Sequence, residues 1–237
     1  MKIDFEGLNV VVTGGAGALG SALVDILLQA GARCYLPVFS RRDLGTFTHR
    51  DHPRVGLAEN VDLTREDAVE EFYRGIPELW ASIHCAGGFA AKPFPELRLA
   101  DLHAQMSRNF VTCFLCCREA VRRIRSRNDD RGGRIVNVAA KSALEPRGGA
   151  GMTAYTASKA AVAALTQSLA EELAGERIWV NAVAPSVMDT EANRKAMPDG
   201  SFDRWPKVAD VAATMAFLAS PQNRSTRGAV VTVYGAA

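Results

Sequence analysis

The sequence contains no long hydrophobic run, no large excess of charge of one sign and no low-complexity segment. A helix that spans a bilayer needs about 20 consecutive apolar residues, and because no run approaches this length we expect no membrane segment. The 28 basic and 26 acidic side chains leave a formal net charge of +2. Apolar residues make up 48% of the 237, which is enough for a large folded domain with its own core.

Aromatic residues do not interleave the basic cluster at residues 118–134. Helical spacing spreads its arginines around a helix end and the turn that follows. We therefore interpret the cluster as a solvated face and expect no nucleic-acid partner.

The five cysteines have no paired spacing, and no signal peptide precedes the first expected strand. Both features are typical of a reducing compartment, so we expect a cytoplasmic location. Cys113, Cys116 and Cys117 form a C-x-x-C-C cluster within an apolar helical run, with no histidine close by in sequence. We interpret them as small buried hydrophobic residues and predict no metal site.

Short apolar stretches that are typical of buried parallel strands alternate with helical patterns along the chain. The expected strands are 8–13, 33–39, 55–61, 80–85, 134–138, 178–183 and 229–233. The expected helices are 21–30, a segment capped by Thr64, 101–127, 157–174 and 208–219. This alternation predicts an α/β, doubly wound Rossmann fold over residues 1–237, a single domain with a seven-stranded parallel sheet and ligands at the carboxyl ends of its strands.

A glycine-rich segment at 14–20 follows the first strand and precedes a helix. Small residues in this context let the backbone approach a pyrophosphate, which then lies at the helix N-terminus. The segment thus predicts a dinucleotide site, although a tight turn alone could also account for it.

The second expected strand ends without the acidic residue that NAD enzymes usually place there to hold the ribose hydroxyls. Ser40, Arg41 and Arg42 occur at this point instead. A guanidinium group pairs with phosphate in a two-pronged fork, so we predict that NADP is preferred to NAD. The alternative is a pair of solvated loop arginines.

Tyr155 and Lys159 lie four residues apart at the start of a long run of helix-forming residues. This spacing places both side chains on one helix face. A nearby positive charge lowers the pKa of a tyrosine from its usual value near ~10, and such a phenol can donate a proton to a carbonyl oxygen or accept one from an alcohol. Alone, the pair is more typical of an ordinary surface helix than of an active site.

Four motifs, in this order and on the expected elements, resemble those of the short-chain dehydrogenase/reductase family over essentially the whole chain. Residues 12–20 are similar to its T-G-x-x-x-G-x-G turn, and residues 155–162 to its Y-x-A-S-K-A-A-V block. Residues 181–185 match its N-x-V-x-P strand end, and Thr190 lies where a P-G-x-x-x-T motif has its threonine. The resemblance implies an NAD(P)-dependent oxidoreductase that acts on a carbonyl or alcohol of a small organic substrate.

The resemblance also implies a role for each matching residue. Tyr155 would be the general acid and base, Lys159 would hold the nicotinamide ribose and lower the pKa of the tyrosine, and Asn109 would support a water-linked proton path. The other implied cofactor contacts are Gly14, Ala16, Gly17, Ala18 and Leu19 at the pyrophosphate, Asp62 and Leu63 at the adenine, Cys85, Ala86 and Gly87 at the ribose, and Pro185, Ser186, Val187 and Thr190 at the nicotinamide. Hydride chemistry belongs to the cofactor, and the protein supplies position and electrostatics.

Several positions depart from the family pattern. Ala18 replaces the second glycine of the turn and adds a methyl group near the phosphates, and Ser186 replaces the glycine after Pro185. The usual N-N-A-G after the fourth strand reads His84-Cys85-Ala86-Gly87. We interpret His84 as a core histidine with a structural role.

The catalytic serine of the family is the departure with the largest consequence. Aligned from the fifth strand, its place is taken by Ala139 and Ala140, which have no hydroxyl. Counted back from Tyr155 by the usual separation, the place falls on Ser142, which we include as a candidate catalytic residue. Both alignments stay open, and the loss of one oxyanion donor, worth roughly 3–4 kcal/mol, need not abolish activity.

Two other functions stay open beside this one. The segment after the fifth strand looks like the A-x-x-A-L of the dihydropteridine reductase branch, which implies a pteridine-type reductase without the serine. A cofactor-binding sensor or scaffold with little turnover is the other, and Tyr155, Lys159 and Asn109 together argue against it. Many relatives are dimers or tetramers, and the apolar helix with Phe110 and Phe114 favours a homo-oligomer. We expect segments 89–95 and 187–206 to select the substrate, the second as a mobile flap.

Overall fold

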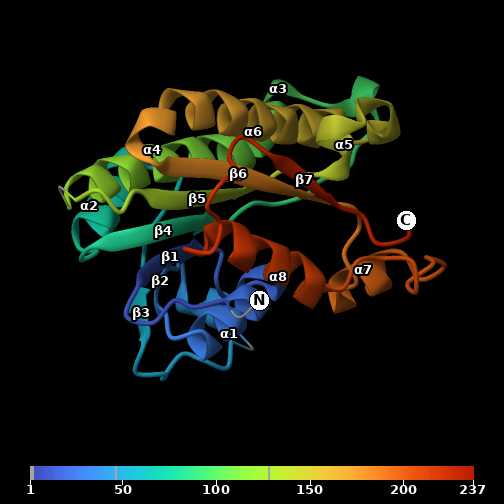
Figure 1. Cartoon of the computed structure of the whole chain (residues 1–237). Helices are drawn as coiled ribbons and strands as arrows, with labels where there is room; N and C mark the ends of the chain where they lie inside the picture. The colour runs from blue at the N-terminus through green and yellow to red at the C-terminus, as the bar shows by residue number, and fades with distance from the viewer. Residues whose placement is uncertain (1–2, 46, 128) are drawn as a thin grey trace.

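The computed structural model describes residues 3–45, 47–127 and 129–237, which form a parallel sheet with helices on both faces (Figure 1). The strands are β1 (Asn9–Thr13), β2 (Arg33–Pro37), β3 (Val55–Ala58), β4 (Leu79–His84), β5 (Gly133–Val138), β6 (Ile178–Pro185) and β7 (Val230–Val233). Their order is β3-β2-β1-β4-β5-β6-β7, and every neighbouring pair is parallel. The order reverses between β1 and β4, where such sheets bind ligands at the carboxyl ends of the strands. The expected fold class is confirmed.

Helices cover the two faces unequally. They are α1 (Ala18–Gln29), α2 (Glu66–Arg74), α3 (Leu99–Gln105), α4 (Thr112–Arg125), α5 (Lys141–Leu144), α6 (Thr153–Glu172), α7 (Glu191–Ala196) and α8 (Val208–Ala219). Figure 1 shows α1 and α8 on one face and α2, α4 and α6 on the other. Apolar residues at helical spacing explain the packing: Val211 and Met215 of α8 are fully buried in one core with Leu23 and Leu27 of α1. Burial of each such side chain stabilises the fold by roughly 1.5–3 kcal/mol.

The structure corrects two expectations about the helices. The segment expected as one helix over 101–127 consists of the end of α3, a π-helical turn at Met106–Val111, and α4. Thr64 does not cap α2, because the cap position is Arg65 and the Thr64 hydroxyl donates to Asp62 Oδ1 at 2.7 Å. The Thr64 hydroxyl thus bonds to a neighbouring side chain instead of to the backbone amides at the start of α2.

Most arginines of the cluster at 118–134 pair with carboxylates. The expected solvated face is wrong for Arg134, which is buried, and for Arg127, whose side chain is 3% exposed. Arg118 pairs with Glu66, Glu70 and Glu119, and Arg131 pairs with Asp129. Because these carboxylates neutralise the positive charges, several guanidinium groups can lie close together on one surface. Within the described residues, no helix has the length and apolar character needed to cross a bilayer.

Candidate active site

The glycine-rich segment forms a tight turn between β1 and α1 at the carboxyl end of the sheet. Gly14 has a φ of +63°, and a Cβ there would lie 2.7 Å from the backbone nitrogen of Ala86. A Cβ on Gly20 would overlap the carbonyl of Gly14, so both positions require glycine. The N-cap of α1 is Gly17, which has no side chain to occupy the first helical amides. Those amides are therefore free to bind an anion.

Ala18 does not disturb this turn. It is the first residue of α1 and is exposed, so its methyl group meets solvent instead of the backbone. A groove of about 600 Å³ runs beside the turn, and its lining includes Gly17, Ala18 and Thr190. The predicted pyrophosphate and nicotinamide contacts thus border one groove.

Gly87, just beyond β4, joins the turn to the polar side chains of the site. A Cβ on this residue would lie 2.7 Å from Asn109 Oδ1 and 3.5 Å from Lys159 Nζ. Because Ala86 touches Gly14, the glycine turn, the end of β4, the π-helical turn and α6 all meet at one end of the sheet. The absence of a side chain at Gly87 is what permits this approach.

Asn109 lies in the π-helical turn and is buried. Its amide pairs with the backbone of Gly88, donating to the carbonyl at 3.0 Å and accepting from the nitrogen at 2.9 Å. It also donates to Ser158 Oγ at 3.1 Å, and that hydroxyl donates to Tyr155 O at 2.7 Å. Asn109 therefore ties the loop after β4 to the first turn of α6. The water-linked proton path that the resemblance implies stays a prediction.

Tyr155 and Lys159 both lie near the start of α6, one turn apart as their spacing predicts. Lys159 is buried, and its Nζ donates to the carbonyl of Val138, the last residue of β5, at 2.7 Å. The ring of Tyr155 packs edge-on against Phe89, with ring centres 5.0 Å apart. Burial lowers the pKa of Lys159 to about 8, because the charged amine is disfavoured away from water.

The pKa of Tyr155 differs from the sequence-based expectation. Burial raises it to about 12, whereas we expected Lys159 to lower it. Burial disfavours the charged phenolate, and this desolvation is the cause of the raised value. The phenol consequently keeps its proton at neutral pH, which suits a proton donor.

Ser142 lies in α5, which packs against α6. Ala139 follows β5 directly, and Ala140 is the N-cap of α5. The Ser142 hydroxyl is buried and finds no hydrogen-bond partner among the described residues. Buried polar atoms in native proteins are nearly always paired, so this hydroxyl is a candidate for binding a substrate oxygen.

The remaining predicted contacts lie at or just beyond the ends of β2, β3, β4 and β6, with Pro185 as the last residue of β6 and Arg41 as the first of a 3-10 helix. Their members are Ser40, Arg41, Asp62, Leu63, Cys85, Ala86, Pro185, Ser186, Val187 and Thr190. Ser186 Oγ donates to Tyr234 O at 2.9 Å, and Thr190 Oγ1 accepts from Asn193 N at 3.1 Å as the cap of α7. The first bond fixes the residue before the predicted flap, and the second caps α7 within the flap.

Two partners escaped the sequence analysis. Glu59, just after β3, binds Arg41 Nε through both carboxylate oxygens at 2.8 and 2.9 Å. Ser158 links Asn109 to Tyr155, as described above. The sequence does contain a signal for Glu59, because an acidic residue follows the strand beside β2. The role of Ser158 can be inferred only once the π-helical turn that holds Asn109 is known.

These residues fit a dinucleotide cofactor. An ammonium group has three donors, and Val138 O is the one hydrogen-bond partner of Lys159 Nζ among the described residues. Two donors are then available for ribose hydroxyls, and the first amides of α1 are available for a pyrophosphate.

Known proteins resemble this chain in sequence and in fold. Residues 8–200, which include all the elements above up to α7, match the family model described as short chain dehydrogenase. The chain is 30% identical over 251 residues to 2,3-dihydroxy-2,3-dihydro-p-cumate dehydrogenase of Pseudomonas putida, covering 98% of this chain and 95% of the relative. It is 33% identical over 248 residues to galactitol 2-dehydrogenase of Rhizobium johnstonii, again covering 98% and 95%. A dehydrogenase/reductase from Sinorhizobium meliloti 1021 superposes with a TM-score of 0.84 at 28% identity, covering 99% of this chain and 96% of that one.

Proposed function

This chain belongs to the short-chain dehydrogenase family and is an oxidoreductase, and we propose that Tyr155 exchanges the proton with its substrate. A bound nicotinamide supplies or receives the hydride at the carbon of a carbonyl or alcohol group. The Tyr155 hydroxyl gives its proton to the oxygen in reduction and takes one in oxidation. The observation that carries this role is the meeting of Gly87, Asn109 and Lys159 beside the start of α6.

Lys159 has a positioning and electrostatic role in this proposal. Its pKa of about 8 leaves it mostly charged at neutral pH. Its two available donors would hold ribose hydroxyls, and its charge would stabilise negative charge that develops on the Tyr155 oxygen during oxidation.

Replacement of Tyr155 by phenylalanine tests the assignment. Tyr155→Phe keeps the ring that packs on Phe89 and removes the proton, so kcat over a panel of carbonyl substrates should fall roughly 10²- to 10⁴-fold. NADP should still raise the melting temperature, and Tyr35→Phe in β2 is the matched control. Wild-type turnover by Tyr155→Phe contradicts the assignment. Cofactor binding by both proteins without any turnover would favour a sensor or scaffold.

We further propose that Ser142 orients the substrate oxygen. Its unpartnered hydroxyl on α5, against the helix of Tyr155, supports this role over Ala139 and Ala140. A donor at this place would bind the same oxygen that receives the tyrosine proton.

NADP is the cofactor that we propose, since Arg41 follows β2 and no acidic residue ends that strand. The carboxylate of Glu59 occupies Arg41 and competes with a 2′-phosphate for the guanidinium group. Glu59→Gln should therefore enlarge the melting-temperature shift that NADP produces and leave the NAD shift unchanged, and Arg41→Ala should reduce the NADP shift. Arg125→Ala, at an exposed ion pair with Glu176 at the end of α4, is the control. A larger shift with NAD than with NADP in the wild type would reverse the preference.

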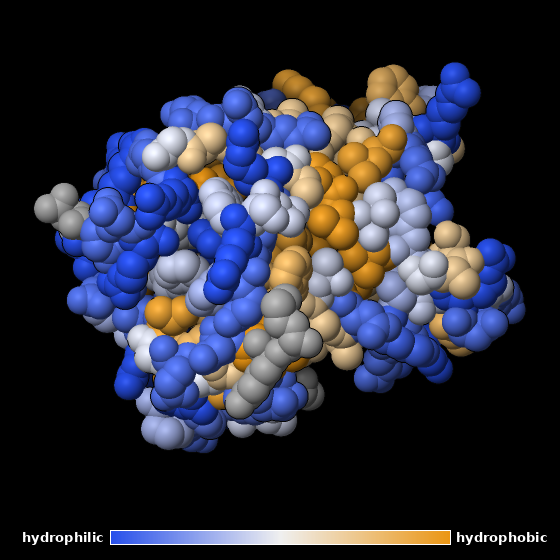
Figure 2. All heavy atoms as spheres, viewed as in Figure 1, coloured by the Kyte–Doolittle hydropathy of each residue, from blue (hydrophilic) through white to orange (hydrophobic). Residues whose placement is uncertain are grey.

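Self-association is also proposed, on two apolar surfaces. Figure 2 shows apolar side chains gathered over β7 and the neighbouring surface toward α8, and β7 is an edge strand of the sheet. Phe114 of α4 is 43% exposed and contacts Phe110. A second copy would cover such surfaces. Light scattering should give a dimer or tetramer for the wild type and a smaller mass for Phe114→Glu; a wild-type monomer at micromolar concentration contradicts the proposal.

The five thiols support a cytoplasmic location. All of them are free, as is usual where glutathione keeps thiols reduced. Cell fractionation tests this location directly.

A further inference from the structure

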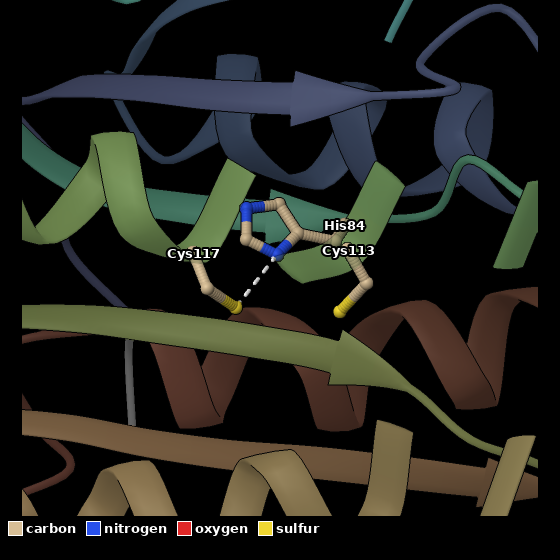
Figure 3. Close-up of side chains that lie close together, drawn as sticks. All are labelled: His84, Cys113 and Cys117. Carbon is tan, nitrogen blue, oxygen red and sulfur yellow. Dashed lines mark hydrogen bonds between the residues drawn. The ribbon is translucent and has the colours of Figure 1, made fainter. Parts of the chain in front are cut away.

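A second cluster of reactive side chains lies in the core, away from the groove at the glycine turn. His84 is the last residue of β4, and Cys113 and Cys117 lie one turn apart on α4, which packs on β4 (Figure 3). One nitrogen or sulfur atom from each lies within 4.8 Å of the others, and all three residues are buried. The cysteines are buried as the sequence predicted, but the topology brings a histidine to them that no local pattern indicates.

We propose that His84, Cys113 and Cys117 bind a zinc ion. Thiolate sulfur and imidazole nitrogen are the ligands that zinc prefers, with bonds of roughly 2.3 and 2.0–2.1 Å. In a tetrahedral site such bonds place the ligand atoms about 3.5–3.8 Å apart. Cys117 Sγ and His84 Nδ1 already lie 3.6 Å apart. Two thiolates also neutralise the charge of the ion, which burial in a core requires.

Asn137 of β5 offers an amide oxygen for the fourth position of the site. Its Oδ1 lies 3.4 Å from Cys117 Sγ and 2.8 Å from His84 Nδ1. The shorter distance is a hydrogen bond that zinc replaces, so Oδ1 and Nδ1 move apart when the ion binds. The orientation of this amide is fixed, because its Nδ2 donates to Thr166 Oγ1 at 2.9 Å. Asn137 Oδ1 therefore points toward His84 and Cys117 and not toward α6.

The surroundings of His84 can accommodate the proton changes that zinc binding requires. Without the ion, Nδ1 donates to Asn137 Oδ1, and Nε2 accepts from Ser82 Oγ at 2.8 Å. When zinc binds, both thiols release their protons to solvent and the imidazole proton moves from Nδ1 to Nε2, so the ring stays neutral. Nε2 then donates to Ser82 Oγ, which turns its own proton toward Tyr73, 2.7 Å away. Metal-bound histidines commonly have such a partner on the second nitrogen.

Because all three side chains are buried, the ion would be taken up as the chain folds. It would cross-link α4, β4 and β5 directly behind Cys85 and Gly87, and its role would be structural.

Metal content of the intact protein tests the proposal. The chain is produced in zinc-supplemented medium, purified without chelators, desalted and measured by plasma mass spectrometry. We expect about one zinc per chain in the wild type and less than about a tenth in Cys117→Ala. Cys116→Ala is the matched control, because Cys116 is buried on the same helix outside the cluster, and it should keep the zinc. Zinc-free wild type, copper in place of zinc, or equal zinc in wild type and Cys117→Ala overturns the proposal.

Cobalt gives a readout that depends on the wild type alone, should the variants fail to fold. Protein produced in medium with cobalt in place of zinc should show the sulfur-to-cobalt charge-transfer band and the visible bands of a tetrahedral ion. Cobalt-free protein, or a spectrum of octahedral cobalt, contradicts the ligand set. Neither measurement uses catalytic activity, so failure here leaves the role of Tyr155 untouched, and the converse also holds.

Discussion

The two ends of the sheet each bury a cation that pairs with no carboxylate among the described residues, and they satisfy it differently. At the amino end, the Arg134 guanidinium lies 4.1 Å from the ring centre of Trp179 and 5.1 Å from that of Trp80, and it donates to backbone carbonyls that include Asn223 O at 2.7 Å. At the carboxyl end, Lys159 donates to Val138 O. Arg134 thus uses its two terminal nitrogens to hold the fold and leaves only Nε without a partner among the described residues, whereas Lys159 keeps two donors available for a ligand.

The largest effect should come from Lys159→Met, which removes the cation at the carboxyl end. We expect kcat/KM to fall about 10³-fold, because the charge and both ribose contacts are lost. The free energy of unfolding at pH 7 should not fall by more than roughly 0.5 kcal/mol, since the lost bond to Val138 O is offset by removal of a buried charge. Steady-state kinetics and urea unfolding measure the two quantities. If Lys159→Met is active, or if it is strongly destabilised, Lys159 does not differ from Arg134 in the way described above.

Arg134→Met makes the matching change at the amino end and should do the opposite. Burial also lowers the pKa of Arg134, to about 10, so removal of its charge offsets part of the loss. Loss of the two ring contacts and of the carbonyl hydrogen bonds outweighs this offset and should lower the free energy of unfolding by about 3 kcal/mol. Because Arg134 lies at the start of β5, kcat should stay close to the wild-type value. Urea unfolding is the measurement. Arg131→Met, at an exposed ion pair with Asp129, should change stability by less than about 1 kcal/mol, and an equal loss in both variants would count against the account.

The pH dependence of stability sharpens the account of Lys159. Its pKa falls from 10.5 to about 8 on folding, so between these values the unfolded chain binds more protons and stability rises with pH. Below pH 8 both states are charged and the cost of burial is fully present. The gain over the window is at most about 3 kcal/mol.

Other buried groups lower the stability over the same pH range. The contribution of Lys159 must therefore be measured as the difference between the wild type and Lys159→Met. Burial raises the pKa values of Cys34 and Cys85 to about 12. Above pH 9 the folded chain therefore binds more protons at these thiols, and their contribution falls as pH rises. The free energy of Lys159→Met subtracted from that of the wild type should still rise between pH 8 and 10.5. A flat difference would show that the Lys159 charge is not disfavoured by burial.

The fold could be predicted because its signals are local. Strands buried on both faces read as short apolar runs, and α8 follows its hydrophobic spacing from Val208 to Ala219 as expected. The glycine turn, too, has a local cause, since Gly14 and Gly20 leave room for backbone. Element ends were less certain, as Thr64 shows, because one nearby acceptor decides which residue caps a helix.

The details of the site depend on contacts between distant segments. A helical pattern does not distinguish α from π spacing, so the turn that holds Asn109 could not be foreseen. The pKa of Tyr155 depends on how deeply packing buries its hydroxyl group, and the spacing of Tyr155 and Lys159 does not indicate that depth. Glu59 meets Arg41 only because β3 pairs with β2, and His84 meets Cys117 only because α4 packs on β4.

Ser142→Ala should have the smallest effect among these variants. We expect kcat to fall about 10²-fold if the hydroxyl binds the substrate oxygen, while the free energy of unfolding stays within about 1 kcal/mol or rises, because a buried hydroxyl without a partner is removed. Thr156→Val is the matched control, since Thr156 Oγ1 is also buried and unpartnered among the described residues. It should leave both kcat and stability nearly unchanged. Wild-type kcat in Ser142→Ala would mean that the carboxyl end lacks a serine donor, and that Tyr155 and Lys159 work there without one.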